Sequence, residues 1–458
     1  MDRPAEAPSA PSSAAWPPSR VVALLLLLLA AAAASSYWVE IVHNAYNDPD
    51  PIVHVPNYDF FQYYAGGYNW RLGLDPYKNH PGVAGAIQHP RFDTHQISGY
   101  IYPPTFLPVY RALAAYGYND ARRSWAVIVL SAYALLVGVA VWLRRGRRLE
   151  LLAAVVLLTM ASYPFIYHVH NGQVDLIAAT LSISAFLLYP RWRGWPSALL
   201  LALAVATKVT PVLILAVMVV YFRDWRLLLK ALACGVAVFL VSLAWVPASL
   251  YREFVFTTLP SIAVSDPSRF NQTVLRFWWQ YPAVLKVVSS LGYAALLFLA
   301  WLAGRNGVGA GVVAEAVSPG AGTEASPSTP DGEAPRPAPD GEQQLRERYA
   351  VLLLAVLFML FFSPLAWQMA YVWVIVPLAL VLTSAPPAGG ARPVIVLGVA
   401  AALLSTRVYD VRVLDLLNVI GAAVAILALM RWYLPLESAG EEAPVALSRA
   451  RHQEAADG

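Results

Sequence analysis

The sequence is poor in cysteine and in charge. Cys234 is the only cysteine among 458 residues, which excludes an intramolecular disulfide and a metal cluster built from several cysteines. Charged residues make up 13% of the chain, against roughly 25% in an ordinary soluble domain, while hydrophobic residues make up 58%. So little charge cannot cover so much apolar surface in water. A cytosolic enzyme, a disordered protein and a disulfide-stapled secreted domain are therefore excluded, which leaves an all-α polytopic membrane protein.

The few charges are unevenly distributed. Residues 1–19, 304–347 and 437–458 together carry 6 basic and 14 acidic residues, whereas the other 373 residues carry 26 basic and 14 acidic ones. Their composition predicts a disordered cytoplasmic N-terminus, a flexible cytoplasmic insert and a disordered cytoplasmic tail, respectively. Between the two ends, 20–436 is expected to form one basic membrane domain. Such a domain suits contact with membrane lipids or phosphates, and no nucleic-acid partner is expected.

Apolar segments recur through this domain. An uncleaved first helix at 21–39 is favoured over a signal peptide, because further apolar segments follow it. We expect about 10–12 transmembrane segments in total. The other expected spans are 124–143, 151–167, 174–189, 197–222, 227–246, 282–303, 349–363, 369–384, 393–406 and 411–432.

Clustered arginines predict the orientation of the spans, because basic loops stay in the cytoplasm. The long loop 40–123 is then expected outside a plasma membrane, and both termini inside. The arginines on which this rests are Arg144, Arg145, Arg147, Arg148, Arg191, Arg193, Arg223 and Arg226.

One segment, 197–222, conflicts with a single span because both of its flanks are basic. Its middle reads Thr207-Lys208-Val209-Thr210-Pro211, and proline disfavours helix at and before its position. We therefore expect a hairpin of two short helices. Its tip would carry Lys208 into an outward-facing cavity, where broken backbone is tolerated.

The long first outer loop is rich in tyrosine around Asp59, which favours short interfacial helices. A carboxyl group that is partly removed from water there has a raised pKa and suits a general base. Alternatively, Asp59 only caps the helix that begins at Phe60. The residues alone leave both interpretations open.

Two further polar regions are expected, one at the outer end of a span and one near membrane depth. His168 and His170 lack an evident third ligand, so a helix junction in which Asn171 caps the next helix is favoured over a metal site. Asp175, expected about one turn inside that helix, is costly in lipid and indicates a function. Lys208 needs either a phosphate or an ion pair with Asp175.

Further polar residues fall in loops that the arginines place outside. Arg269 and the Asn271-Gln272-Thr273 run, also a possible glycosylation acceptor, can hydrogen-bond sugar or phosphate. Trp367 and Gln368 follow a helix-stopping proline, and Arg407 lies at the same rim. All the polar regions thus face one side, which predicts a single outward-facing active site.

Taken in chain order, these pieces resemble glycosyltransferase family 87, within the GT-C class of integral-membrane glycosyltransferases. The matching pieces are Asp59-Phe60 with Tyr63-Tyr64, Gly73 to Tyr77, Tyr102-Pro103-Pro104, Asn171-Gly172-Gln173, Lys208 to Pro211, Asn271-Gln272, and Ser363-Pro364 with Trp367. The resemblance implies a GT-C-type fold, a polyprenyl-phosphate sugar donor, most often of mannose, and Asp59 as the catalytic base. Members of the family often carry histidine directly after the tryptophan, where this chain has Gln368 and Met369. A second polar role there, and the acceptor, stay open.

The expected reaction moves a hexose to a lipid-linked or cell-envelope glycan acceptor outside the membrane. It inverts the anomeric carbon, since no second carboxylate is evident as a nucleophile. Lys208, Arg269 and Arg407 are expected to bind the donor phosphate, so that no metal or other cofactor is required. The residues expected to contact sugar or acceptor are Tyr63, Tyr102, Asn171, Gln173, Asp175, Asn271, Gln272, Trp367 and Gln368.

Two other functional classes compete with this one. A secondary transporter or lipid flippase needs a site near the midplane that opens to both sides, and it usually shows internal repeats. A non-catalytic scaffold would use the 304–347 insert for docking, but it leaves Asp175 and Lys208 unexplained.

Overall fold

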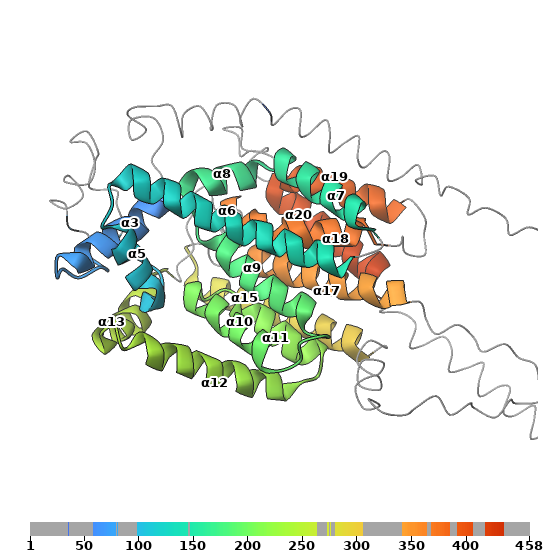
Figure 1. Cartoon of the computed structure of the whole chain (residues 1–458). Helices are drawn as coiled ribbons and strands as arrows, with labels where there is room; N and C mark the ends of the chain where they lie inside the picture. The colour runs from blue at the N-terminus through green and yellow to red at the C-terminus, as the bar shows by residue number, and fades with distance from the viewer. Residues whose placement is uncertain are drawn as a thin grey trace, which may run out of the picture.

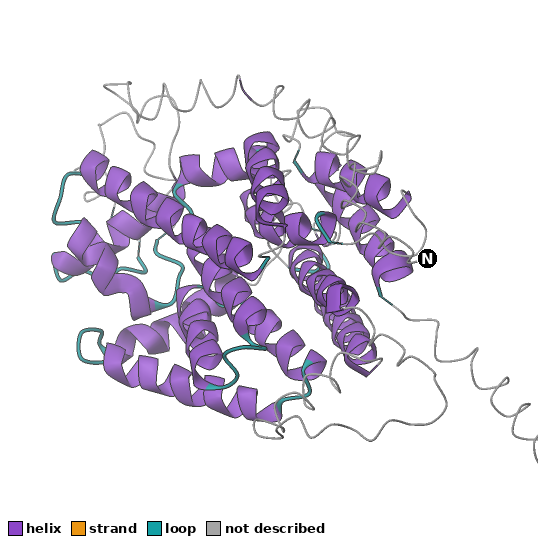
Figure 2. Ribbon diagram, turned by 45° about the vertical axis from the view of Figure 1, so that its right-hand side comes forward, coloured by secondary structure: helices purple, strands orange, loops and turns teal. Residues whose placement is uncertain are grey.

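The structure is a computed structural model, and it consists mostly of helices (Figures 1 and 2). Among the residues that it describes, no strand occurs. Those residues are Ser35, 58–78, His80, 99–144, 147–262, Thr273, Leu275, 280–305, 341–363, 368–384, 392–405 and 417–434.

The N-terminal part of the described chain begins with α3 (Tyr58–Arg71), a 3-10 turn η2 (Pro104–Phe106) and α5 (Leu107–Leu113). It continues with α6 (Tyr118–Leu143), α7 (Arg148–Ala161), α8 (Tyr163–Asn171), α9 (Asp175–Leu188), α10 (Trp195–Thr207), α11 (Val212–Tyr221) and α12 (Trp225–Ser242).

The remaining elements complete the bundle. They are α13 (Ala248–Glu253), the π-helical turn η4 (Phe254–Thr258), α14 (Leu259–Ile262), α15 (Pro282–Ala303), α17 (Gly341–Phe361), the 3-10 helix η7 (Gln368–Val374), α18 (Ile375–Leu382), α19 (Arg392–Leu404), α20 (Leu417–Ala428) and the π-helical turn η9 (Leu429–Tyr433).

Fewer helices than expected are long enough to cross a bilayer. Of the described helices, α6, α12 and α15 pass tests of length and hydropathy, and α7 with α8 makes a fourth if the bent pair counts as one span. Six further apolar helices are shorter, with 10–17 residues each, and α17 has 21 residues but carries charged side chains in its first half. The membrane character is supported, while the expected 10–12 segments and the GT-C arrangement stay predictions.

The expected span 151–167 is bent by 70° between α7 and α8. The Ser162 hydroxyl accepts a hydrogen bond from the backbone N–H of Phe165 at 3.2 Å, so it caps a new helix at this point. Pro164 sits in the first turn of that helix, where its missing N–H costs nothing. A serine cap followed by proline therefore replaces one straight span with two helices.

The segment 197–222 is a hairpin, as predicted. It breaks between α10 and α11, and Lys208 at the break contacts Asp175, the first residue of α9. The far ends of the two helices return to the opposite end of α9. There the rings of Phe222 and Tyr189 lie 4.5 Å apart, and Tyr189 donates a hydrogen bond to Asp224.

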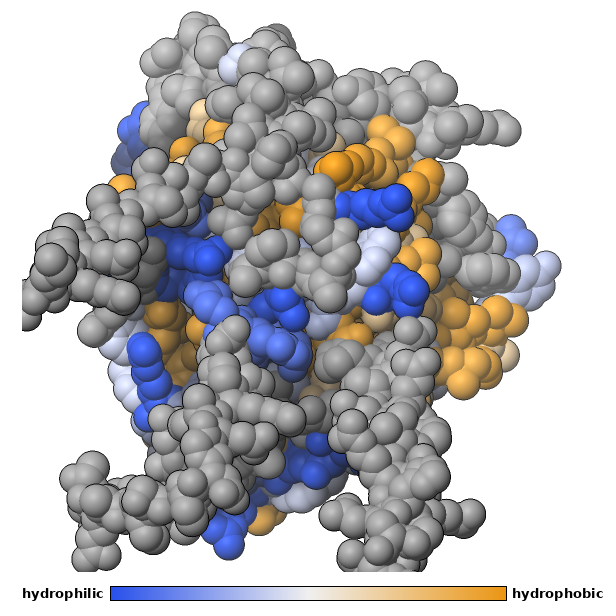
Figure 3. Space-filling view, turned by 90° about the vertical axis from the view of Figure 1, so that its right-hand side faces the viewer, coloured by the Kyte–Doolittle hydropathy of each residue, from blue (hydrophilic) through white to orange (hydrophobic). Residues whose placement is uncertain are grey.

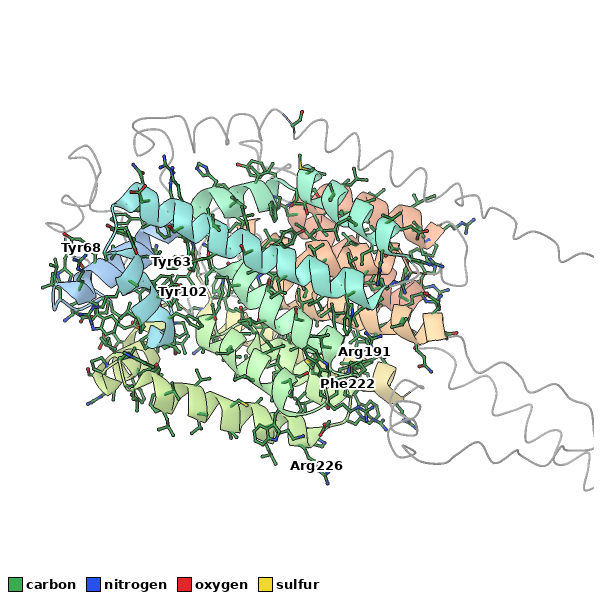
Figure 4. All side chains as sticks on the ribbon, in the orientation of Figure 1. Tyr63, Tyr68, Tyr102, Arg191, Phe222 and Arg226 are labelled. Carbon is green, nitrogen blue, oxygen red and sulfur yellow. The ribbon has the colours of Figure 1, made fainter. Side chains whose placement is uncertain are left out.

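Arginines of the predicted cytoplasmic loops lie together at one end of the molecule, the arginine-rich end. Arg191 lies 4.7 Å from the Trp142 ring, and Arg144 donates a hydrogen bond to the Thr383 carbonyl at 3.2 Å. In Figure 4, Arg191, Phe222 and Arg226 lie at this end, far from Tyr63 and Tyr102. Figure 3 looks onto it and shows hydrophilic side chains among the residues drawn in grey. The tyrosine-rich helices lie at the other end, where Arg71 of α3 and Arg111 of α5 are also found.

Element boundaries differ from the sequence predictions at two loops. Helix α17 begins at Gly341, so the last residues of the predicted flexible insert 304–347 are helical. Helix α6 begins at Tyr118, so the first outer loop ends before 123. In both cases polar residues extend an apolar helix by a turn or more, a boundary that hydropathy alone places too late.

Several sequence predictions lie outside the described residues. They concern 1–19, almost all of 21–39, 306–340, 411–416 and 437–458.

Candidate functional site

The site is built first on α3, a helix that is not among the candidate spans. Gly67 lets α3 approach α5 closely, because a Cβ there would lie 2.3 Å from the Tyr110 backbone. Tyr63 stacks on Tyr110 with 5.0 Å between ring centroids, and it meets Tyr102 edge-on at 4.8 Å. Tyr63 and Tyr102 lie near each other in Figure 4. This aromatic packing fixes the face of α3 that carries Asp59.

The turn between α8 and α9 packs against that face. Gly172 has a φ of +65°, and a Cβ there would lie 2.7 Å from the Phe60 Cβ, so both backbone shape and space require glycine. The Trp125 indole N–H donates to the Gly172 carbonyl at 2.6 Å, and the Val174 backbone N–H donates to the Tyr63 hydroxyl at 3.3 Å. The turn is thus held on both sides.

Gln173 occupies the centre of the site. Its Oε1 accepts hydrogen bonds from the Tyr63 hydroxyl at 3.2 Å and from the Tyr102 hydroxyl at 3.3 Å. Burial raises the pKa of both tyrosines well above the ordinary value, so both hydroxyls stay protonated as donors. The Gln173 side chain also lies near Asp59 and lowers the pKa of its carboxyl group. One amide therefore binds the two tyrosines beside the acid.

Asp59 has a strongly perturbed acidity. It keeps part of its accessible surface, but protein surrounds the carboxyl, and this loss of hydration raises its pKa from 3.8 to about 7. The Gln173 side chain and then the Lys208 charge oppose the rise. A carboxyl group with a pKa near neutrality is suited to accept a proton.

Next to Asp59 lies a buried ion pair. The Lys208 ammonium contacts both carboxylate oxygens of Asp175 at 2.7 and 2.8 Å. The Asp175 side chain is 3% exposed and the Lys208 side chain 25%. The Trp373 indole N–H donates to Asp175 Oδ1 at 2.8 Å. Asp175 thereby accepts hydrogen bonds from two parts of the chain, while the Lys208 side chain remains partly exposed.

Two histidines lie at the junction between α8 and α9, where the helix-junction interpretation expects them. His168 and His170 lie on the last turn of α8, and His168 is fully buried. Within the described part of the chain, no three His, Cys, Asp or Glu side chains gather as a metal site would need. The predicted cap is wrong, because Asn171 is the last residue of α8, while Val174 occupies the capping position of α9 without a side-chain hydrogen bond. The Asn171 amide donates to the Tyr167 carbonyl of its own helix at 2.9 Å. Asp175 is the first residue of α9 and not a turn inside it.

The structure brings together the residues predicted from the first loop, the α8–α9 turn and the hairpin tip. These are Asp59, Tyr63, Tyr102, Gln173, Asp175 and Lys208. Arg269, Arg407, Asn271, Gln272 and Trp367, and the side chain of Gln368, lie outside the described residues.

Trp373 is a site residue that the sequence reasoning missed. It lies in an apolar run and has the character of an ordinary residue of a membrane-buried helix. The available signal was that a buried indole N–H needs a partner, and Asp175 was the buried acid in need of donors.

Residues 100–318, close to half of the chain, match the family model of glycosyltransferase family 87. The resemblance to this family is confirmed. Together with the apolar helices, this match indicates a membrane glycosyltransferase. Among curated proteins and among solved structures, none matches the chain.

The family 87 match includes part of the site. Tyr102, Gln173, Asp175 and Lys208 fall inside the matched range, whereas Asp59 precedes it. The hydrogen bond from Tyr63 to Gln173 therefore joins the matched region to α3, the helix that carries Asp59.

Proposed function

We propose that this membrane glycosyltransferase moves a hexose from a polyprenyl-phosphate donor to a lipid-linked or cell-envelope glycan acceptor. Mannose is the sugar that the family resemblance favours. The active site would face the outside of the plasma membrane, opposite the arginine-rich end. The observation that carries the proposal is the carboxyl group of Asp59, whose pKa is raised to about 7, next to Lys208 at the tip of the hairpin.

Asp59 would act as the general base. The acceptor hydroxyl loses its proton to the Asp59 carboxylate as its oxygen forms a bond to the anomeric carbon. The bond from that carbon to the phosphate oxygen breaks at the same time, and polyprenyl phosphate leaves with the electron pair. A single direct displacement inverts the anomeric carbon.

Lys208 would stabilise the departing phosphate. An ammonium has three hydrogens, and the two Asp175 oxygens engage two of them. The third is left for an oxygen of the phosphate, whose negative charge grows as the bond breaks. Arg269 and Arg407 are proposed as further phosphate ligands. The Lys208 ammonium would thus pair with Asp175 and bind the donor phosphate at the same time.

Asp59→Asn tests the proposal directly. The purified variant and the wild type are given a panel of polyprenyl-phosphate sugars, and the release of polyprenyl phosphate is measured. We expect one donor to be used, and the rate to fall by about 10²- to 10⁴-fold in the variant, because the amide cannot accept the proton. Asp120→Asn is the matched control, since Asp120 is exposed in the first turn of α6 and pairs only with Arg123 among the contacts described. Near-normal turnover by Asp59→Asn would refute the role of the base.

The pH dependence supplies a second test. Only the ionised carboxylate accepts a proton, so the rate should rise with pH through about 7 and then level off. If the wild-type rate instead rises with pH near pH 4, the essential carboxyl group is not Asp59 with its raised pKa.

A further inference from the structure

We propose that the two turns at the base of the hairpin form a binding site for the headgroup of an anionic phospholipid. One turn, 189–194, joins α9 to α10, and the other, 222–224, joins α11 to α12. Both lie at the arginine-rich end, far from Tyr63 and Tyr102 in Figure 4, so this inference does not rest on the proposed function. The basal site, as we call it, consists of Arg191, Arg193, Arg223, Arg226 and Lys230.

The two turns are packed against each other. Tyr189 of the first turn donates a hydrogen bond to the Asp224 carboxylate of the second, and its ring centroid lies 4.5 Å from that of Phe222. Lys230 of α12 reaches the first turn as well, because a Cβ built on Gly194 would lie 3.1 Å from the lysine ammonium nitrogen. The turns and the first part of α12 therefore form one surface.

This surface is strongly basic. The acid within the two turns is Asp224, and its carboxylate is already engaged, because it accepts from Tyr189 and, at 3.0 Å, from the backbone N–H of Arg226. The ion pairs found between described residues include none of Arg223, Arg226 and Lys230. Arginine binds phosphate oxygens through paired N–H donors, so a phosphate group suits these cations.

Arg223 occupies a position that its backbone does not favour. The Asp224 N–H donates to the Val219 carbonyl at 3.2 Å. The Arg223 N–H donates to the Val220 carbonyl at 3.3 Å, which completes a Schellman motif at the end of α11. Glycine is usual at this point of the motif because φ is positive there. Arg223 has a φ of +52°, and no other described residue except glycine has a positive φ. Backbone strain is therefore tolerated where it presents a cation, which indicates a function for the guanidinium.

The surroundings of the basal site favour a lipid over a soluble phosphate. Trp192, Trp195 and Trp225 lie close in sequence to the basic residues and are exposed, and exposed tryptophans favour the headgroup level of a bilayer. The following turns of α12 expose leucine side chains that acyl chains can contact, namely Leu228, Leu229 and Leu232. A soluble phosphate would use the cations and leave these apolar side chains in water. A phospholipid uses both, and the negative charge of its headgroup supplies the attraction.

The test measures lipid binding by the full-length protein in a mild detergent. Dioleoylphosphatidylglycerol is added and bound lipids are counted by native mass spectrometry, with dioleoylphosphatidylcholine, which has the same acyl chains and no net charge, as the reference lipid. The wild type should bind the anionic lipid more tightly. In Arg223→Gly/Arg226→Gln its Kd should rise about 25-fold, since each basic residue near a headgroup contributes about fivefold in affinity. The Kd of the neutral lipid should stay unchanged.

Arg123→Gln is the matched control. Arg123 is an exposed arginine near the start of α6, the end of that helix opposite Arg144, and it pairs with Asp120. Its loss should leave the Kd of the anionic lipid unchanged, because it lies at the other end of the molecule. An equal rise in Kd in this control and in the double variant would show a general attraction to a basic protein, which overturns a site at the two turns.

The single variant Arg223→Gly separates binding from folding. Glycine relieves the positive φ, so the midpoint of thermal unfolding should hold or rise. The Kd of the anionic lipid should nevertheless rise about fivefold. Arg223→Lys keeps the charge and should retain most of the affinity. An unchanged Kd in Arg223→Gly, with the unfolding midpoint raised or lowered, would leave Arg223 a role in the turn alone and overturn the inference.

A competition with inorganic phosphate identifies the kind of ligand. Phosphate lacks acyl chains, so it should not displace phosphatidylglycerol from the wild type at concentrations near the Kd of the lipid. Displacement at such concentrations would mean that a soluble phosphate compound is the ligand, and it would overturn the lipid site. Because no arm of the test uses sugar transfer, a failure of Asp59 as the base leaves these outcomes unchanged.

Discussion

Each end of the molecule has an ion pair with one buried side chain, and these two pairs are built in opposite ways. At the site end, the acid is buried and the base is partly open: the Asp175 side chain is 3% exposed and that of Lys208 25%. At the arginine-rich end, the base is buried and the acid is open: the Arg144 side chain is 3% exposed and that of Glu342 41%. The separations are similar, 2.7 Å and 3.2 Å.

The difference indicates which pair anchors and which pair serves a site. Arg144 also donates to the Thr383 carbonyl and lies 5.8 Å from the Tyr349 ring, so it ties several helix ends together without Glu342. Asp175 binds the Lys208 ammonium through both carboxylate oxygens, while the Lys208 side chain stays partly exposed. A buried acid with an accessible cation is an arrangement that can receive an anion.

The largest effect is expected from Lys208→Met. It leaves Asp175 buried with the indole N–H of Trp373 as its remaining donor described here, which should lower the free energy of unfolding by about 3–5 kcal/mol. Sugar transfer should be lost as well. Thermal unfolding in detergent and the release of polyprenyl phosphate measure the two effects.

The double variant Asp175→Asn/Lys208→Met separates these effects. It removes both charges, so stability should largely return while transfer does not. Recovery of transfer together with stability would mean that Lys208 only neutralises Asp175.

A smaller effect is expected from Trp373→Phe. The ring volume is nearly kept, but Asp175 loses a charge-assisted hydrogen bond at a buried position, which should cost about 1.5–3 kcal/mol of stability. Trp142→Phe is the matched change at the other end, where the ring contacts Arg191 at a partly open position and the loss should be about 0.5–1 kcal/mol. Equal losses in thermal unfolding would contradict the contrast between the ends.

The smallest effect is expected from Glu342→Gln. The acid is exposed and Arg144 keeps its carbonyl partner, so the loss should stay below about 1 kcal/mol and transfer should be unchanged. Unfolding and activity assays run beside those of Lys208→Met check this. A large fall in activity would show that the arginine-rich end acts on the site.

The sequence predicted the parts of the fold and of the site that local chemistry determines. The hairpin followed from Pro211 and its basic flanks, and Asp59 stood out as an acid in an aromatic loop. The α7–α8 bend was missed because Ser162 and Pro164 sit inside an otherwise continuous apolar run.

Contacts between distant residues could not be predicted in the same way. Gln173 meets Tyr63 across 110 positions, and Trp373 meets Asp175 across 198. Such pairings depend on how helices stack. A residue type indicates only that a polar atom needs a partner, and not which one it finds. The cap assigned to Asn171 was wrong for a local reason, because α8 extends through Asn171 and α9 begins only after Val174.

The hairpin at Lys208 also sets the parity of the chain. Two short helices that go in and come back add an even number of traversals, so every later element runs opposite to the direction that one long span would impose. Helix α17 consequently starts beside Arg144, and η7 starts at the far end, where Trp373 reaches Asp175. Straightening the 208–211 break would not merely displace a lysine. It would send the indole to the wrong end of the protein.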